Sequence, residues 1–99
     1  MVVSKQIQGP IIESLYDSSN VIASKYNIES KKLVIIFGKG GQYLYENVEF
    51  SDFTKFDSSD SQGKSLNEFI KKYKAQKFPD IDVSSIKEDI KRLIQEQKK

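Results

Sequence analysis

The sequence contains no cysteine and no histidine. Without cysteine the chain can form no disulfide, and without either residue it lacks the usual ligands of zinc and iron. The commonest catalytic bases and nucleophiles are missing for the same reason, so we expect a non-enzymatic protein that uses no metal and no cofactor. Acidic residues gathered around Mg²⁺ are the remaining catalytic alternative, and its candidates are Glu46, Asp57 and Asp60.

Arginine and long apolar runs are also scarce. Arg92 is the one arginine among sixteen basic residues, and lysine supplies a point charge instead of the planar fork that reads phosphates and base edges. No apolar run approaches the roughly 20 residues that span a bilayer, and residues 1–9 lack the apolar stretch of a signal peptide. These absences favour a cytoplasmic protein without a membrane partner.

The net charge is only +2, but acidic and basic residues are concentrated in two separate segments of the chain. Five acidic residues and one lysine fall between positions 46 and 60, whereas five lysines and one glutamate fall between 64 and 77. The 99 residues allow one small domain of modest stability. Because subunits that share a core would stabilise so small a domain, we expect a homo-oligomer.

An apolar run at 33–37, a glycine-rich turn at 38–41 and a tyrosine pair at 43 and 45 predict a β-hairpin. A tight turn centred on Lys39-Gly40 would place Ile36 opposite Tyr43 and Val34 opposite Tyr45. Segment 20–26, bounded by polar turns, predicts one strand before the hairpin. Residues 1–17 form an N-terminal arm, for which a short helix and a strand-like lead-in are both open.

Amphipathic patterns predict two short helices after the hairpin. The first runs from about residue 51 and places Phe50, Phe53 and Phe56 along one face toward the core. The second covers residues 65–73, where Ser65 and Glu68 fit a capping box. The expected fold class is α+β, with a three-stranded antiparallel β-meander packed against these two helices and an additional C-terminal amphipathic helix.

The C-terminal helix is predicted over residues 85–97. Its apolar stripe consists of Ile86, Ile90, Leu93 and Ile94. The predicted strand at 33–37 is apolar on both sides, so its sheet needs a second cover. The stripe therefore either folds back over the second sheet face or packs on another copy of the chain.

Six short motifs occur in the order typical of one family. They are SSNV at 18–21, KYN at 25–27, LxIxF at 33–37, GQYLYENV at 41–48, SQGKSLN at 61–67 and IKKY at 70–73. This ordered set resembles the KTSC domain, which is named for the C-terminus of some lysyl-tRNA synthetases and also occurs as free-standing bacterial and phage proteins. The resemblance implies a KTSC-like domain at 18–78, preceded by the arm at 1–17. Residues 79–99 then hold the C-terminal helix, which packs on the domain or mediates oligomerisation.

Three groups of residues are candidates for a ligand site. The loop with Ser61, Gly63 and Lys64 offers hydroxyls, backbone N–H groups and a charge to an anion such as phosphate, and it matches the family's motif together with Asn67. Aromatics on a sheet can stack bases, and this group consists of Tyr26, Tyr43 and Tyr45. The third group is a basic edge that could follow phosphates, with Lys71, Lys72, Lys74 and Lys77. Each group also has an ordinary structural interpretation, as a turn, as half-buried packing or as a solvated helix face.

The sequence favours a small protein that binds a phosphate-bearing nucleotide and, if phage-encoded, sequesters a nucleotide signal. A compact anion needs one pocket with a few lysines, hydroxyls and aromatics, whereas binders of nucleic-acid polymers usually have a strongly basic face. The pI of about 8.7 is modest for the second class. RNA or single-stranded nucleic-acid binding, which the resemblance implies, is the alternative, and protein–protein interaction through the C-terminal helix is the third.

Overall fold

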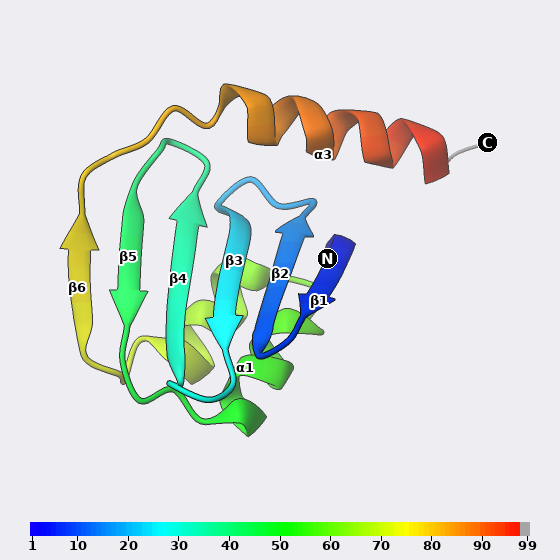
Figure 1. The fold of residues 1–99 in the computed structure, drawn as a ribbon. Helices are drawn as coiled ribbons and strands as arrows, with labels where there is room; N and C mark the ends of the chain where they lie inside the picture. The colour runs from blue at the N-terminus through cyan, green and yellow to red at the C-terminus, as the bar shows by residue number, and fades with distance from the viewer. Residues whose placement is uncertain (98–99) are drawn as a thin grey trace.

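The computed structural model describes residues 1–97, which form one six-stranded antiparallel sheet with helices on both faces (Figure 1). The strands lie side by side in chain order. They are β1 (Val2–Gln8), β2 (Ile11–Tyr16), β3 (Val21–Asn27), β4 (Lys32–Phe37), β5 (Gln42–Tyr45) and β6 (Ala75–Phe78). The helices are α1 (Phe50–Asp57), α2 (Gln62–Ser65), its π-helical continuation η1 (Leu66–Ile70), and α3 (Ser84–Gln97).

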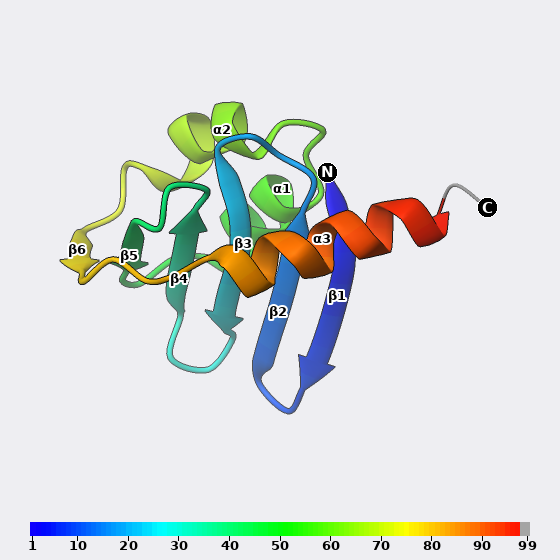
Figure 2. The same ribbon diagram turned by 90° about the horizontal axis from the view of Figure 1, so that it is seen from above.

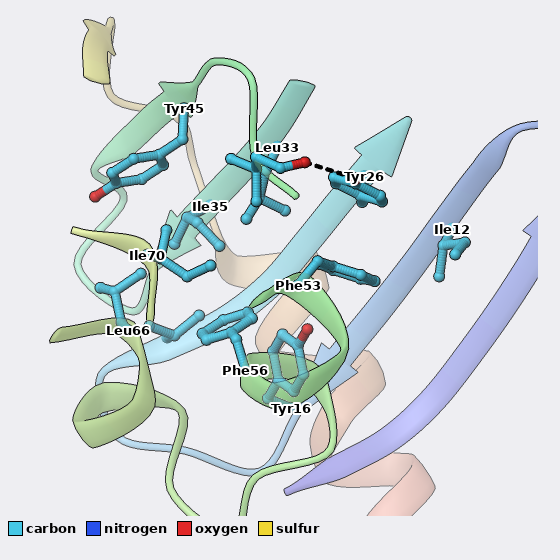
Figure 3. Packing of buried hydrophobic residues seen from close by; sticks show 12 residues of the cluster. Ile12, Tyr16, Tyr26, Leu33, Ile35, Tyr45, Phe53, Phe56, Leu66 and Ile70 are labelled. Atoms are coloured by element: carbon cyan, nitrogen blue, oxygen red, sulfur yellow. Dashed lines mark hydrogen bonds between the residues drawn. The ribbon is translucent and has the colours of Figure 1, made fainter. Parts of the chain in front are cut away.

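The segment α1–α2–η1 covers one face of the sheet, and α3 crosses the other (Figure 2). On the first face, the Tyr26 ring stacks on Phe53 with 4.4 Å between centroids, and its hydroxyl donates to the Val48 carbonyl at 2.7 Å (Figure 3). Leu33 and Ile35 of β4 are fully buried in the same cluster. This core confirms the α+β class and the packing of the phenylalanine face, although Phe50 itself is half exposed.

A polar network lies within this core, between the sheet and α1. The Tyr16 hydroxyl donates to Asp57 Oδ1 at 2.5 Å and is hydrogen-bonded to Ser24, while Lys5 Nζ lies 2.7 Å from Asp57 Oδ2. Burial and the adjacent carboxylate raise the pKa of Tyr16, so the hydroxyl keeps its proton. The network joins β1 and β2 to the end of α1.

The second face is covered by this chain's own C-terminal helix. Ile90 of α3 is buried with Ile22 and Ala23 of β3, and Ile86 and Ile94 pack around them. The apolar stripe of α3 was expected either over the second sheet face or against another copy of the chain, and in the structure it packs over the second sheet face. A homo-oligomer stays a prediction, with no surface assigned to it. Among residues 1–97 no helix has the length and hydropathy needed to cross a membrane.

The expected three-stranded meander was wrong, because the sheet has six strands. The arm at 1–17 forms the β1–β2 hairpin, which turns at Gly9 with a φ of +57°. Strand β1 was not predicted because it lies at the sheet edge. Its residues Lys5 to Gln8 are exposed, so the sequence shows no apolar alternation. Strand β6 has four residues, none fully buried, and pairs with β5 at the other edge.

The predicted hairpin register was wrong by one residue. Phe37 N donates to Gly41 O at 2.8 Å and Gly40 N donates to Phe37 O at 2.9 Å, so the loop has three residues and not two. Tyr43 therefore lies opposite Ile35, and Tyr45 opposite Leu33. Since side chains alternate across a strand, this shift turns both tyrosines to the face covered by α1 and η1.

The predicted capping box at Ser65 was displaced from the real helix start. Helix α2 begins at Gln62, and the Ser61 side chain accepts from Lys64 N at 3.4 Å. Ser65 is inside the helix, where its hydroxyl donates to Ser61 O at 2.9 Å. Helix α3 begins at Ser84, whose N–H donates to the Asp82 carboxylate at 2.9 Å. The cap of α2 is thus supplied by Ser61 and not by Ser65.

Gly40 offers a test of the turn. Its φ is +98°, and a Cβ there would lie 2.6 Å from the Ile81 carbonyl oxygen. We expect Gly40→Ala to lower the free energy of unfolding by more than about 2 kcal/mol, measured by urea denaturation. Gly9→Ala is the matched control, because Gly9 also has a positive φ but open space around it, and it should cost about 1 kcal/mol. Equal costs at the two glycines would contradict the close approach of Ile81.

The phenylalanine face of α1 offers a second test. Phe53→Ala should lower the free energy of unfolding by about 3–5 kcal/mol, because this fully buried ring contacts Tyr26 in the core. Phe50→Ala, on the same helix, is the control and should cost less than about 1 kcal/mol, since 52% of Phe50 is exposed. Similar losses for the two variants would show that α1 presents a different face to the sheet.

Candidate functional site

A pocket of about 450 Å³ lies at the β5–β6 side of the sheet, on the face covered by α1 and η1. The strands β4 and β5, the turn between them, strand β6 and the residue after η1 supply its walls. It is lined by Phe37, Lys39, Gly41, Tyr43, Tyr45, Lys71, Lys77 and Asp80. The pocket thus combines three aromatic rings with three lysines and one carboxylate, and its volume falls in the range of small-molecule sites. We call it the tyrosine–lysine pocket.

The aromatic wall comes from two adjacent strands. Phe37 and Tyr43 meet edge to face, with 5.6 Å between ring centroids and an interplanar angle of 87°. Tyr45 places its ring against the core, and its hydroxyl points away from the cluster (Figure 3). Burial, and to a smaller extent Tyr43, raises the pKa of the Tyr45 hydroxyl above its usual value. Tyr45 is therefore a neutral hydrogen-bonding group at neutral pH.

The three lysines reach the pocket from different elements. Lys77 on β6 lies opposite Tyr43 and forms an ion pair with Asp80 at 3.4 Å. Lys71 follows η1, and Lys39 is in the β4–β5 turn. Among residues 1–97 neither Lys39 nor Lys71 has a carboxylate partner. Two unneutralised positive charges next to aromatic rings favour an anionic ligand with an aromatic or ring-shaped part.

Four of the candidate residues come together in this pocket, namely Tyr43, Tyr45, Lys71 and Lys77. Tyr26 does not, because its ring is stacked within the core and its hydroxyl is bonded to Val48. Phe37, Lys39 and Asp80 also line the pocket, although they were not among the predicted candidates. Phe37 and Lys39 could have been predicted from the loop length, because a three-residue turn brings the end of β4 next to Tyr43.

The predicted loop at 61–67 lies elsewhere. A Cβ on Gly63 would lie 3.0 Å from the Asn20 side chain, so this glycine lets α2 approach the loop before β3. Lys64 and Asn67 are exposed, and Ser61 caps α2. None of these four residues lines the tyrosine–lysine pocket. Their arrangement is that of a short helix packed on a loop.

The rest of the basic edge is divided between ion pairs and solvent. Lys72 pairs with Asp52 at 2.9 Å, and the Tyr73 hydroxyl donates to the same carboxylate. The hydrogen bond from Tyr73, followed by the contact with Lys72, lowers the pKa of Asp52 below its usual value. Lys74 is exposed beyond η1. Lys71 and Lys77 are thus the members of the edge that face the pocket.

The acidic residues considered for Mg²⁺ have other surroundings. Asp57 is buried between Tyr16 and Lys5 and has both oxygens occupied. In the part of the chain that the structure describes, no three acidic side chains lie close enough together to hold a metal ion. The geometry of residues 1–97 therefore offers binding groups for an anion at the pocket and no metal cluster.

A second pocket of about 580 Å³ lies on the opposite face, beneath α3. Its walls are α3, the loop between β2 and β3, and the β4–β5 turn. None of the residues predicted for the site lines it. Lys39 is the residue that it shares with the tyrosine–lysine pocket.

The comparisons with known proteins agree with the motifs. The KTSC domain family model matches residues 17–73, more than half of the chain. The crystal structure of a KTSC domain protein from Yersinia pestis is similar, with a TM-score of 0.63 and 26% sequence identity. The match covers 77% of this chain and 100% of that chain. No curated protein matches the sequence.

Proposed function

This chain belongs to the KTSC domain family, and we propose that it is a non-enzymatic binding protein that holds a phosphate-bearing nucleotide. The tyrosine–lysine pocket between β5, β6 and the end of η1 is the proposed site. One observation supports this most strongly: Lys39 and Lys71, which have no carboxylate partner among residues 1–97, lie beside the Phe37–Tyr43 ring pair in one pocket.

The proposed contacts follow the chemistry of the two walls. Lysine ammonium groups are strong donors to phosphate oxygens, so Lys71 and Lys39 bind the phosphate in this proposal. The base lies against the aromatic wall, where a π-face accepts any base without sequence preference. The Tyr45 hydroxyl then hydrogen-bonds a sugar or phosphate oxygen.

Charge supports a compact ligand over a polymer. The chain has a net charge of +2, and acidic residues such as Asp52 and Asp80 lie close to the basic ones. A polymer would need a longer basic track, because each neutralised phosphate adds to its affinity. RNA remains the second candidate, since the exposed Lys72 and Lys74 could extend the contacts beyond the pocket.

Variants of the pocket test the proposal. Lys71→Gln should weaken binding of mononucleotides or dinucleotides by about 1.5–3 kcal/mol, the worth of a charge-assisted contact, and Tyr45→Phe by about 0.5–1.5 kcal/mol. Isothermal titration calorimetry with a panel of nucleotides and their unphosphorylated nucleosides gives the affinities. Lys64→Gln is the matched control, because Lys64 is also exposed but lies outside the pocket. If Lys64→Gln weakens binding and Lys71→Gln does not, the site is at the α2 loop.

The salt dependence of the binding affinity distinguishes a nucleotide ligand from RNA. A pocketed nucleotide should lose little affinity between about 50 and 200 mM salt, whereas RNA held by several lysines should lose orders of magnitude. Fluorescence anisotropy with labelled single-stranded RNA, beside calorimetry with nucleotides, measures both. Tight, strongly salt-dependent RNA binding together with no nucleotide binding would reverse the order of the two functions.

A further inference from the structure

We propose that the pocket beneath α3 is a second ligand site, which takes a small amphipathic anion with a carboxylate or phosphate head and an apolar body. The pocket lies on the opposite sheet face from the tyrosine–lysine pocket. Its volume of about 580 Å³ is that of a small-molecule site. The proposal is independent of the nucleotide pocket.

The floor of this pocket is apolar. Ile22 of β3 and the α3 residues Ile90 and Ile94 form it, and they belong to the cluster that packs α3 on the sheet. Ile22 and Ile90 are less than a tenth exposed, so the floor is held in place by the same contacts that hold the helix. An apolar body of a ligand would gain by covering this surface.

The rim of the pocket is basic. Lys87 and Lys91 stand one helical turn apart on α3, and Lys39 comes from the turn between β4 and β5. Like charges at this helical spacing repel each other, and in residues 1–97 none of the three lysines has an ion-pair partner. An anionic head between them removes this repulsion. Asp17 is the one acidic residue in the lining, so the rim keeps an excess of positive charge.

The loop between β2 and β3 adds hydroxyl groups to the same rim. Ser18 Oγ accepts the Asn20 N–H at 3.3 Å, so its own proton is available to a ligand oxygen. Ser19 beside it is exposed and also lines the pocket. A charged head at the rim and an apolar body over the isoleucines therefore satisfy both parts of the pocket at once.

The test uses probes that separate the two parts of the ligand. Octanoate and octyl phosphate have a head and an apolar body, octanol lacks the charge, and inorganic phosphate lacks the body. We expect both amphiphiles to bind at concentrations below about 1 mM, with shifts of the Ile22, Ile90 and Ile94 methyl signals in NMR spectra. Stronger binding of one amphiphile than the other identifies the head. Octanol or inorganic phosphate binding as tightly as the amphiphiles would overturn the proposal.

Variants at Lys87 and Lys91 test whether the amphiphile binds in the pocket beneath α3. The double change Lys87→Gln and Lys91→Gln should weaken amphiphile binding at least about tenfold, because two charge-assisted contacts are lost from exposed positions that the fold does not need. Lys71→Gln is the control, since it changes the nucleotide pocket and should leave amphiphile binding unchanged. No binding by the wild-type protein, or equal binding by the double variant, would overturn the second site, whereas a nucleotide result alone leaves it intact.

Discussion

The turn between β4 and β5 is the constraint on which the rest of this fold depends. Gly40 closes the three-residue loop with a positive φ, and its carbonyl accepts the Ile81 N–H at 2.9 Å. The first feature sets the β4–β5 register, and the second fixes the segment that leads from β6 into α3. A side chain at position 40 would collide with the Ile81 carbonyl, so one small residue links the sheet to the helix that covers its second face.

Both pockets are consequences of that turn. The register directs Tyr43 and Tyr45 toward η1, where β6 adds Lys77 beside them. A two-residue turn would have directed the same tyrosines toward α3, and the aromatic wall would not exist. The anchored segment before α3 brings that helix across β3, which leaves the second pocket between the helix and the turn. The pockets thus lie on opposite faces of one hairpin end.

Buried apolar patterns made part of this predictable from the sequence. The apolar run of β4, the Phe53–Phe56 face of α1 and the stripe on α3 all reflect contacts that exclude water, and each element was predicted. The edge strands were not, because β1 and β6 expose residues such as Lys5 and Gln76 and are held by backbone hydrogen bonds. Of the residues in the candidate pocket, the sequence named Tyr43, Tyr45, Lys71 and Lys77 as candidates. The places of Phe37 and Lys39 depend on the length of the β4–β5 loop, which its glycine content leaves open.

The small net charge of +2 is compatible with two lysine-lined pockets because several acidic residues are paired elsewhere. Asp57 is held by Lys5 and Tyr16 inside the core, and Asp52 by Lys72 and Tyr73 beside it. Four lysines without a carboxylate partner in residues 1–97 line the two pockets, and a concave surface strengthens their field. They are Lys39, Lys71, Lys87 and Lys91. Lys39 lines both pockets, so an anion bound in either one lowers the positive potential that the other presents.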